Sequence, residues 1–125
     1  MENTYRIIVT GSRDWENKSC VWDAIDEVWG KLSIDCTFIV VHGDCPTGAD
    51  RFADELCSLW TEWAVERHPA DWDSYGRAAG PIRNQRMVDL GADMVLAFIK
   101  NRSRGATGCA RMALEAGLPL RVWTE

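Results

Sequence analysis

The sequence contains no apolar stretch that approaches the length of a membrane-spanning segment. Its first ten residues also lack a basic region followed by a long apolar run, which is the pattern of an export signal. These absences predict a cytoplasmic protein without a membrane partner. No repeat, linker or low-complexity tract divides the 125 residues, so we expect one domain over residues 1–125.

Metal-binding patterns are missing as well. The five cysteines are scattered without a CxxC pair, and neither histidine stands at a ligand spacing from them. Structural zinc sites need such clusters, whereas single cysteines in a reducing cytosol are usually buried free thiols. We therefore expect free thiols, no metal site and no required cofactor.

Positive charge is scarce. Fourteen basic residues stand against nineteen acidic ones, and the formal net charge of -5 argues against a nucleic-acid partner held by broad phosphate neutralisation. Eleven of the basic residues are arginines, whose planar guanidinium suits phosphate and carboxylate groups. Glycine-rich segments typical of loops hold several of them, namely Arg13, Arg77, Arg83, Arg102 and Arg104. A local basic pocket is therefore compatible with the negative net charge of the chain.

Apolar runs alternate along the chain with segments of helical periodicity. Strands are predicted over residues 5–10, 37–42, 63–67, 93–99 and 120–123. Helices are predicted over 18–33 and 47–60, from Gly80-Pro81 to Gly91, and from the loop after the fourth strand to Gly117. A long loop is expected over 69–80, and Thr47 with Asp50 has the spacing of a capping box.

This alternation is typical of the α/β class. We expect a Rossmann-like three-layer α/β/α sandwich whose five-stranded parallel sheet has the order 3-2-1-4-5. In such a sheet the winding direction reverses between strands 1 and 4, and the loops that leave these strands diverge to form a crevice. A ligand is therefore expected at the C-terminal ends of the strands.

Four glycine-containing segments fall on that edge, at 11–15, 42–50, 80–84 and 103–107, and each precedes or opens a helix. Glycine lets the backbone approach a ligand, and the free amides of a helix N-terminus attract anions. The ligand-binding candidates, which include two loop tryptophans able to stack on a base, are Gly11, Ser12, Arg13, Trp15, Gly43, Asp44, Gly48, Asp50, Trp72, Gly80, Arg83, Asn84, Ser103, Arg104, Gly105, Ala106 and Thr107. The chain has no GxGxxG after the first strand and no GxxxxGK[ST], which excludes the ordinary dinucleotide and P-loop fingerprints.

Four ordered motifs resemble the YspA-like branch of the SLOG superfamily: VTGSRDW, VHGDCPTGADRFADE, PADWDSYGRAAGPIRNQRM and SRGATGCARMALEAGLPLRVW. The resemblance covers nearly the whole chain. It implies a Rossmann-like fold whose glycine loops bind nucleotides or nucleotide-derived ligands, with some relatives coupled to ADP-ribose-type signalling. The LOG-type phosphoribohydrolases of the same superfamily carry PGGxGTxxE with an essential final glutamate. Here the corresponding stretch reads NRSRGATGCAR, and Glu115 lies far down the helix.

Three functions are compatible with these residues. The first is a sensor or sequestering module for a nucleotide or a phosphorylated, ADP-ribose-like small molecule. The main alternative is a hydrolase of N-glycosidase or phosphoribohydrolase type that uses Asp44 or Asp50 with Arg83. The third is a purely structural interaction domain without a nucleotide ligand.

Individual residues near the expected crevice have competing interpretations. We expect ligand contact for Asp44 and helix capping for Asp50. His42 is interpreted as a hydrogen-bonded core residue rather than a catalytic base. Among seven tryptophans, the five outside the expected loops are predicted in the core or in a homo-oligomer interface.

Overall fold

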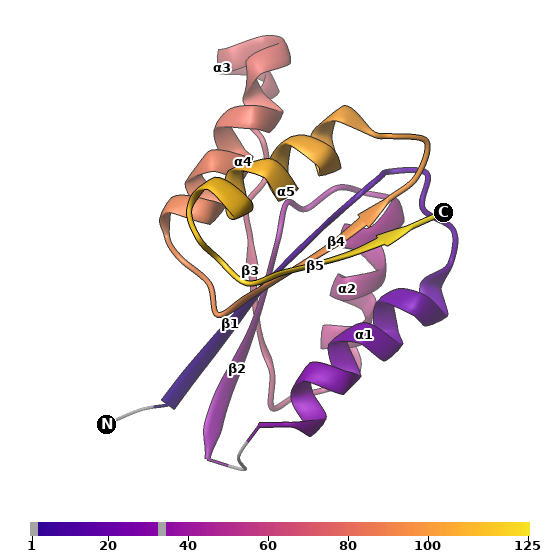
Figure 1. Ribbon diagram of the computed structural model, residues 1–125, viewed down its shortest axis with the longest axis vertical. Coiled ribbons are helices and arrows are strands. Elements are labelled where there is room, and N and C mark those ends of the chain that lie inside the picture. The colour runs from indigo at the N-terminus through magenta and orange to yellow at the C-terminus, as the bar shows by residue number, and fades with distance from the viewer. Residues whose placement is uncertain (1–2, 33–34) are drawn as a thin grey trace.

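The computed structural model describes residues 3–32 and 35–125, which form one five-stranded parallel sheet between two layers of helices (Figure 1). The strands are β1 (Asn3–Gly11), β2 (Cys36–His42), β3 (Ala64–Arg67), β4 (Met94–Ile99) and β5 (Leu120–Thr124), in the order β3-β2-β1-β4-β5. The long helices are α1 (Lys18–Gly30), α2 (Gly48–Leu59), α4 (Ala79–Asp89) and α5 (Arg104–Glu115). The predicted fold class and strand order are confirmed.

The central strand β1 is buried on both faces, which explains why its sequence is apolar throughout instead of alternating. Ile7 packs in a core cluster with Val21 of α1 and Ala53 of α2. The next residue, Ile8, points to the opposite face and packs with Met87 of α4 and Cys109 of α5. The α1–α2 pair and the α4–α5 pair therefore cover opposite faces of the sheet (Figure 1).

The long loop predicted over residues 69–80 is wrong for most of its length. A short helix α3 (Trp72–Tyr75) and a 3-10 turn η1 (Gly76–Ala78) lead directly into α4. Asp71 starts α3 because its carboxylate accepts a hydrogen bond from the Ser74 amide at 3.2 Å, as an N-cap does. In Figure 1, α3 extends the column of α4 away from the sheet.

Other boundaries differ by a few residues from the prediction. Helix α1 ends at Gly30, and residue 33 of the predicted helix lies outside the described residues. Gly91 follows α4 with a φ of 86°, the left-handed conformation expected after a helix end.

None of the described helices is both long and apolar enough to cross a membrane. Of the five tryptophans predicted in the core or in a homo-oligomer interface, four belong to or pack against the α1–α2 core cluster, namely Trp22, Trp29, Trp63 and Trp123.

Candidate ligand-binding site

A cavity of ≈ 690 Å³ opens at the carboxyl ends of β1 and β4. Its walls come from the loops that follow these two strands, from η1 and α4, and from the start of α5. The lining residues are Thr10, Gly11, Arg13, Asp14, Cys45, Asp50, Trp72, Arg77, Gly80, Pro81, Arg83, Asn84, Met87, Lys100, Asn101, Ser103, Arg104, Gly105 and Ala106. The location is the expected crevice between strands 1 and 4, and the volume suits a nucleotide-sized molecule.

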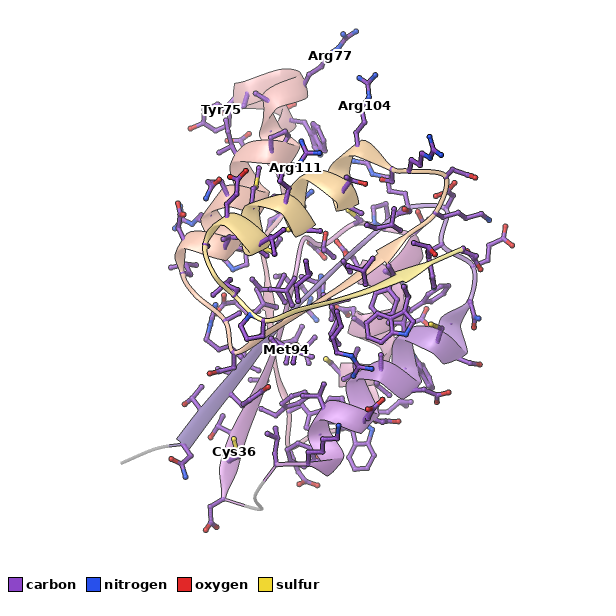
Figure 2. The ribbon with its side chains drawn as sticks, viewed as in Figure 1. Cys36, Tyr75, Arg77, Met94, Arg104 and Arg111 are labelled. Carbon is purple, nitrogen blue, oxygen red and sulfur yellow. The ribbon has the colours of Figure 1, made fainter. Side chains whose placement is uncertain are left out.

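The outer lining of the cavity, here called the rim, is cationic. It consists of Arg13, Arg77, Lys100 and Arg104, which are exposed or partly exposed. Figure 2 shows Arg77 and Arg104 extending from η1 and α5 at the same end of the molecule. Lys100 lies 3.5 Å from Glu16, whereas the three arginines have no ion pair within the described part of the chain. The rim thus has three guanidiniums available to an anion.

The N-terminus of α5 adds to this positive end of the cavity. Its N-cap residue, Ser103, makes no side-chain capping bond, and the first turn holds no acidic residue. The first amides and the helix dipole are therefore unneutralised there. At Gly105 a Cβ would meet no atom within 4 Å, so the backbone itself is open to the cavity. The amide of Asn84 fixes this helix start by donating to the Gly105 carbonyl at 3.3 Å.

The inner lining of the cavity, here called the floor, consists of buried side chains from β1, α2, α4 and α5, namely Thr10, Asp50, Asn84, Met87 and Ala106. Asp50 is 4% exposed, and burial raises the pKa of its carboxyl group. Its Oδ2 accepts hydrogen bonds from the amides of Gly43 at 3.1 Å and Cys45 at 3.4 Å. The predicted helix-capping role of Asp50 is therefore wrong, because the carboxyl group binds the preceding loop instead.

Arg83 lies between the cavity and the protein backbone. Its Nη1 donates to the carbonyl of Gly43 and to that of His68, the latter at 3.3 Å, and its Nε donates to Asn84 Oδ1 at 2.7 Å. Helix α4 begins at Ala79, so Arg83 is its fifth residue and lies in the second turn. The prediction that Arg83 lies in the first turn is wrong, and most of its donors already hold neighbouring segments together.

Two of the predicted site glycines serve chain packing. A Cβ at Gly11 would collide with Ala49, and one at Gly48, whose φ is 76°, would collide with the Ser12 carbonyl. Ser12 is 1% exposed, and its Oγ accepts from the Lys100 amide at 2.8 Å. The glycines and Ser12 thus let the loops after β1 and β4 and the start of α2 approach one another. Gly48 and Ser12 lie outside the lining of the cavity.

The two loop tryptophans have different environments. Trp15 is 3% exposed, its ring packs edge-on against Phe98 at 5.5 Å, and its Nε1 donates to the Asn17 carbonyl. The predicted stacking of Trp15 on a ligand is therefore wrong. Trp72 is 48% exposed and lines the cavity, with the Arg13 guanidinium 5.4 Å from its ring centroid. A cation over an indole face in this way is a cation–π contact.

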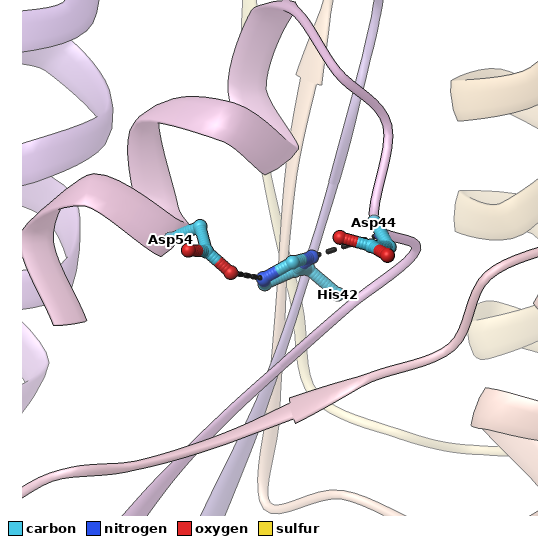
Figure 3. Close-up of side chains that lie close together, drawn as sticks. All are labelled: His42, Asp44 and Asp54. Carbon is cyan, nitrogen blue, oxygen red and sulfur yellow. Dashed lines mark hydrogen bonds and ion pairs between the residues drawn. The ribbon is translucent and has the colours of Figure 1, made fainter. Parts of the chain in front are cut away.

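His42, Asp44 and Asp54 form a cluster beside the cavity and outside its lining (Figure 3). His42 Nδ1 accepts from the Asp44 amide at 2.9 Å, which leaves the ring proton on Nε2, 2.7 Å from Asp54 Oδ2. Arg67 also donates to Asp54, at 2.7 Å. Because both ring nitrogens are engaged, the cluster does not suit a metal ion, and His42 is the hydrogen-bonded core residue that was predicted.

Three further candidates, Gly43, Asp44 and Thr107, lie away from the cavity lining. Asp44 is exposed and has a φ of 57°, so the structure does not bring it to the ligand position expected for it. Thr107 lies one turn inside α5, where its amide donates to the Ser103 carbonyl. Lining residues that were not among the predicted site residues are Thr10, Asp14, Cys45, Arg77, Pro81, Met87, Lys100 and Asn101. Lys100 and Asn101 directly follow the fourth strand, beside the point where the winding direction of the sheet reverses. This position could have identified them as site residues from the sequence.

Comparisons with known proteins place the chain in a family. Residues 5–75 match the family described as YspA, cpYpsA-related SLOG family. The chain is 39% identical over 124 residues to Gene 61 protein of Mycobacterium phage D29, across 92% of this chain and 93% of the phage protein. Two crystal structures of the C-terminal domain of PF1911 hydrogenase from Pyrococcus furiosus align over 98% of this chain, and over 93% and 94% of theirs, with a TM-score of 0.43 and identities of 21% and 20%. The chain belongs to the YspA, cpYpsA-related SLOG family.

Proposed function

We propose that the protein binds a nucleotide or a nucleotide-derived phosphorylated molecule in the cavity at the carboxyl edge of its sheet, as a sensor or sequestering module. The observation that carries the proposal is that Arg13, Arg77 and Arg104 line the same cavity as the uncapped start of α5. Guanidiniums and helix amides are the donors that proteins use for phosphate. Membership of a SLOG family supports nucleotide-related binding.

Trp72 provides a place for the base of such a ligand. One face of its ring carries the Arg13 guanidinium, and about half of the side chain is exposed at the cavity. A nucleobase stacking on the indole would keep the apolar contact, while Arg13 turned toward the phosphate would gain a charge-assisted hydrogen bond. The proposed ligand therefore has an anionic end at the rim and a planar end near α3.

A second candidate is a nucleotide-processing hydrolase, and the observation in its favour is Asp50. A buried carboxyl group with a raised pKa at the floor of a cavity has the properties of a general acid. Asp44 lies outside the cavity lining, and Arg83 is largely engaged by the backbone, so catalysis would depend on Asp50. Glu115 is exposed at the end of α5 and does not line the cavity.

Thermal denaturation with a panel of AMP, ADP, ADP-ribose, NAD⁺ and ribose 5-phosphate tests the binding proposal. A ligand at 100 times its Kd should raise the free energy of unfolding by about 2.7 kcal/mol. Chromatography of the same incubations for free base, nucleoside or inorganic phosphate distinguishes binding from hydrolysis. The absence of any stabilisation at millimolar ligand, combined with no small molecule released from natively purified protein, would contradict the proposal.

A further inference from the structure

Asp50 has hydrogen-bonding capacity that the described protein does not use. Its Oδ2 accepts from two backbone amides, but its Oδ1 is buried without a hydrogen-bond partner. A buried polar atom left unpaired costs about 1–3 kcal/mol. The other such atom among the described residues, Trp63 Nε1, belongs to a residue of the α1–α2 core cluster and does not line the cavity. Asp50 therefore combines an unpaired atom with a place on the cavity floor.

The side-chain amide of Asn84, another polar group of the floor, is already paired. Asn84 accepts from Arg83 with its Oδ1 and donates to Gly105 with its Nδ2. Met87 and Ala106 complete the floor with apolar surface. A ligand that reaches the floor therefore meets the carboxyl group of Asp50, whose Oδ1 is buried without a hydrogen-bond partner.

The contacts of Asp50 also indicate where its proton lies. Because two amides donate to Oδ2, that oxygen is an acceptor, and the proton of the neutral acid must be on Oδ1. No ion pair with Asp50 occurs within residues 3–32 and 35–125. Burial raises the pKa of Asp50 more than the nearby His42, the hydrogen bonds from Cys45 and the Arg83 guanidinium lower it, which favours the neutral form.

We propose that Asp50 donates a hydrogen bond from Oδ1 to an uncharged acceptor of the ligand, a sugar oxygen or a nucleobase carbonyl or ring nitrogen, while the ligand's phosphate lies at the rim. The inference rests on the proposed function and adds the chemistry of the ligand's inner end. Phosphate or pyrophosphate alone can occupy the rim but has no neutral arm to reach the floor. Asp50 therefore contributes to recognition of the nucleoside part and not of the anion.

Calorimetric titration with ADP-ribose and with pyrophosphate tests the inference in wild type, Asp50→Ala and Asp50→Asn. Asp50→Ala should weaken ADP-ribose binding roughly tenfold or more and leave pyrophosphate binding unchanged. Asp50→Asn should restore most of the ADP-ribose affinity, because a side-chain amide offers an acceptor to the two backbone amides and a donor in place of Oδ1–H. Asp44→Asn, which changes an exposed carboxylate outside the cavity, is the matched control with wild-type affinities.

Each alternative outcome has a distinct meaning. Equal ADP-ribose affinity of wild type and Asp50→Ala overturns the inference and leaves the proposed function standing, as does wild type that binds pyrophosphate but not ADP-ribose. An Asp50→Asn variant as weak as Asp50→Ala shows that the ionised carboxylate is needed, which overturns the donor role. Wild type that binds neither compound overturns the inference, whereas the proposed function is contradicted only if the other nucleotides of the panel also fail to bind and no small molecule is released from natively purified protein.

Asp50→Ala also leaves two backbone amides unpaired, so a second measurement covers the case in which it does not fold. The carbon-13 chemical shift of the wild-type Asp50 carboxyl group should be that of a neutral acid at pH 7. It should move with ADP-ribose and stay unchanged with pyrophosphate. A shift typical of an ionised carboxylate at pH 7 overturns the inference.

Discussion

The Arg83 guanidinium donates to the main-chain carbonyl of Gly43, and through this bond α4 holds the loop that follows β2. The contact is close enough that a Cβ at Gly43 would collide with the guanidinium. The same loop supplies the two amides that bind Asp50. The glycine and the arginine together therefore position the carboxyl group at the floor of the cavity.

From this relationship we expect Arg83→Ala to lower the free energy of unfolding by on the order of 2 kcal/mol, because the carbonyls of Gly43 and His68 lose a charged donor. Arg83→Lys should recover only part of the loss, since an ammonium group cannot replace the fork of donors. Urea denaturation monitored by tryptophan fluorescence measures both variants. A loss below about 0.5 kcal/mol for Arg83→Ala would show that the contacts are dispensable.

A second prediction concerns the start of α5, where two glycines differ in their relation to the cavity. Gly105 lines it and Gly108 does not, and a Cβ at either position meets no atom within 4 Å. Alanine in place of either glycine should stabilise the helix by up to about 1 kcal/mol. Gly105→Ala should nevertheless weaken pyrophosphate binding roughly tenfold, because the methyl group projects where an anion would approach the first amides.

Gly108→Ala is the matched control and should keep wild-type affinity for pyrophosphate. Calorimetric titration gives the affinities and thermal melts give the stabilities. If the two variants bind pyrophosphate equally well, the α5 N-terminus does not hold the anion.

The sheet was predictable from the sequence, whereas several site residues were not. Fully apolar strands alternating with helices leave few topologies, and right-handed crossovers reduce them further, which made the order 3-2-1-4-5 predictable. Trp15 could not be assigned correctly from its neighbours in the sequence, because nothing in the loop segment indicates that its ring packs against Phe98 of β4. Burial of a loop side chain depends on tertiary packing, which no short pattern encodes.

Asp50 illustrates a conflict between two interactions. Its spacing from Thr47 predicts a capping box, yet the Thr47 hydroxyl donates to the Arg13 carbonyl at 2.9 Å and the Asp50 carboxyl group binds the loop before the helix. Between the two amides that donate to Asp50, those of Gly43 and Cys45, the residue Asp44 adopts the left-handed backbone conformation with a φ of 57°. That conformation is rare for a residue other than glycine, so sequence alone did not indicate it.

A third prediction follows from the ion pairs at the edge of the sheet. Arg6 binds Glu66 with both terminal nitrogens, at 2.7 and 2.9 Å, and His68 lies 2.7 Å from the same carboxylate. The hydrogen bonds from Arg6, followed by that from His68, lower the pKa of Glu66 from 4.5 to about 2. A carboxyl group with a lowered pKa in the folded state stabilises the protein above the unfolded pKa and loses this contribution as the pH falls through the folded value.

The contribution of Glu66 should therefore be complete above about pH 4.5 and disappear toward about pH 2. Urea denaturation of Glu66→Gln at a series of pH values should show lower stability at pH 7 and a shallower decline on acidification than wild type. Glu62→Gln, which changes an exposed residue without an ion pair among the described residues, should follow the wild-type profile. Parallel declines for Glu66→Gln and wild type would contradict the assignment.

The last prediction contrasts the two tryptophans once expected to act alike. Trp15→Ala removes a ring that is 3% exposed and packs against Phe98, so it should lower the free energy of unfolding by about 3–5 kcal/mol. Trp72→Ala removes a side chain that is 48% exposed and should change stability by less than about 1 kcal/mol. If a base stacks on Trp72, its loss should weaken AMP binding by about 1–1.5 kcal/mol and leave ribose 5-phosphate binding unchanged, because that compound has no base. Trp72→Phe should restore part of the AMP affinity, since a smaller aromatic face remains. Equal losses for AMP and ribose 5-phosphate would instead mean that Trp72 acts by holding Arg13 at the rim, 5.4 Å from its ring.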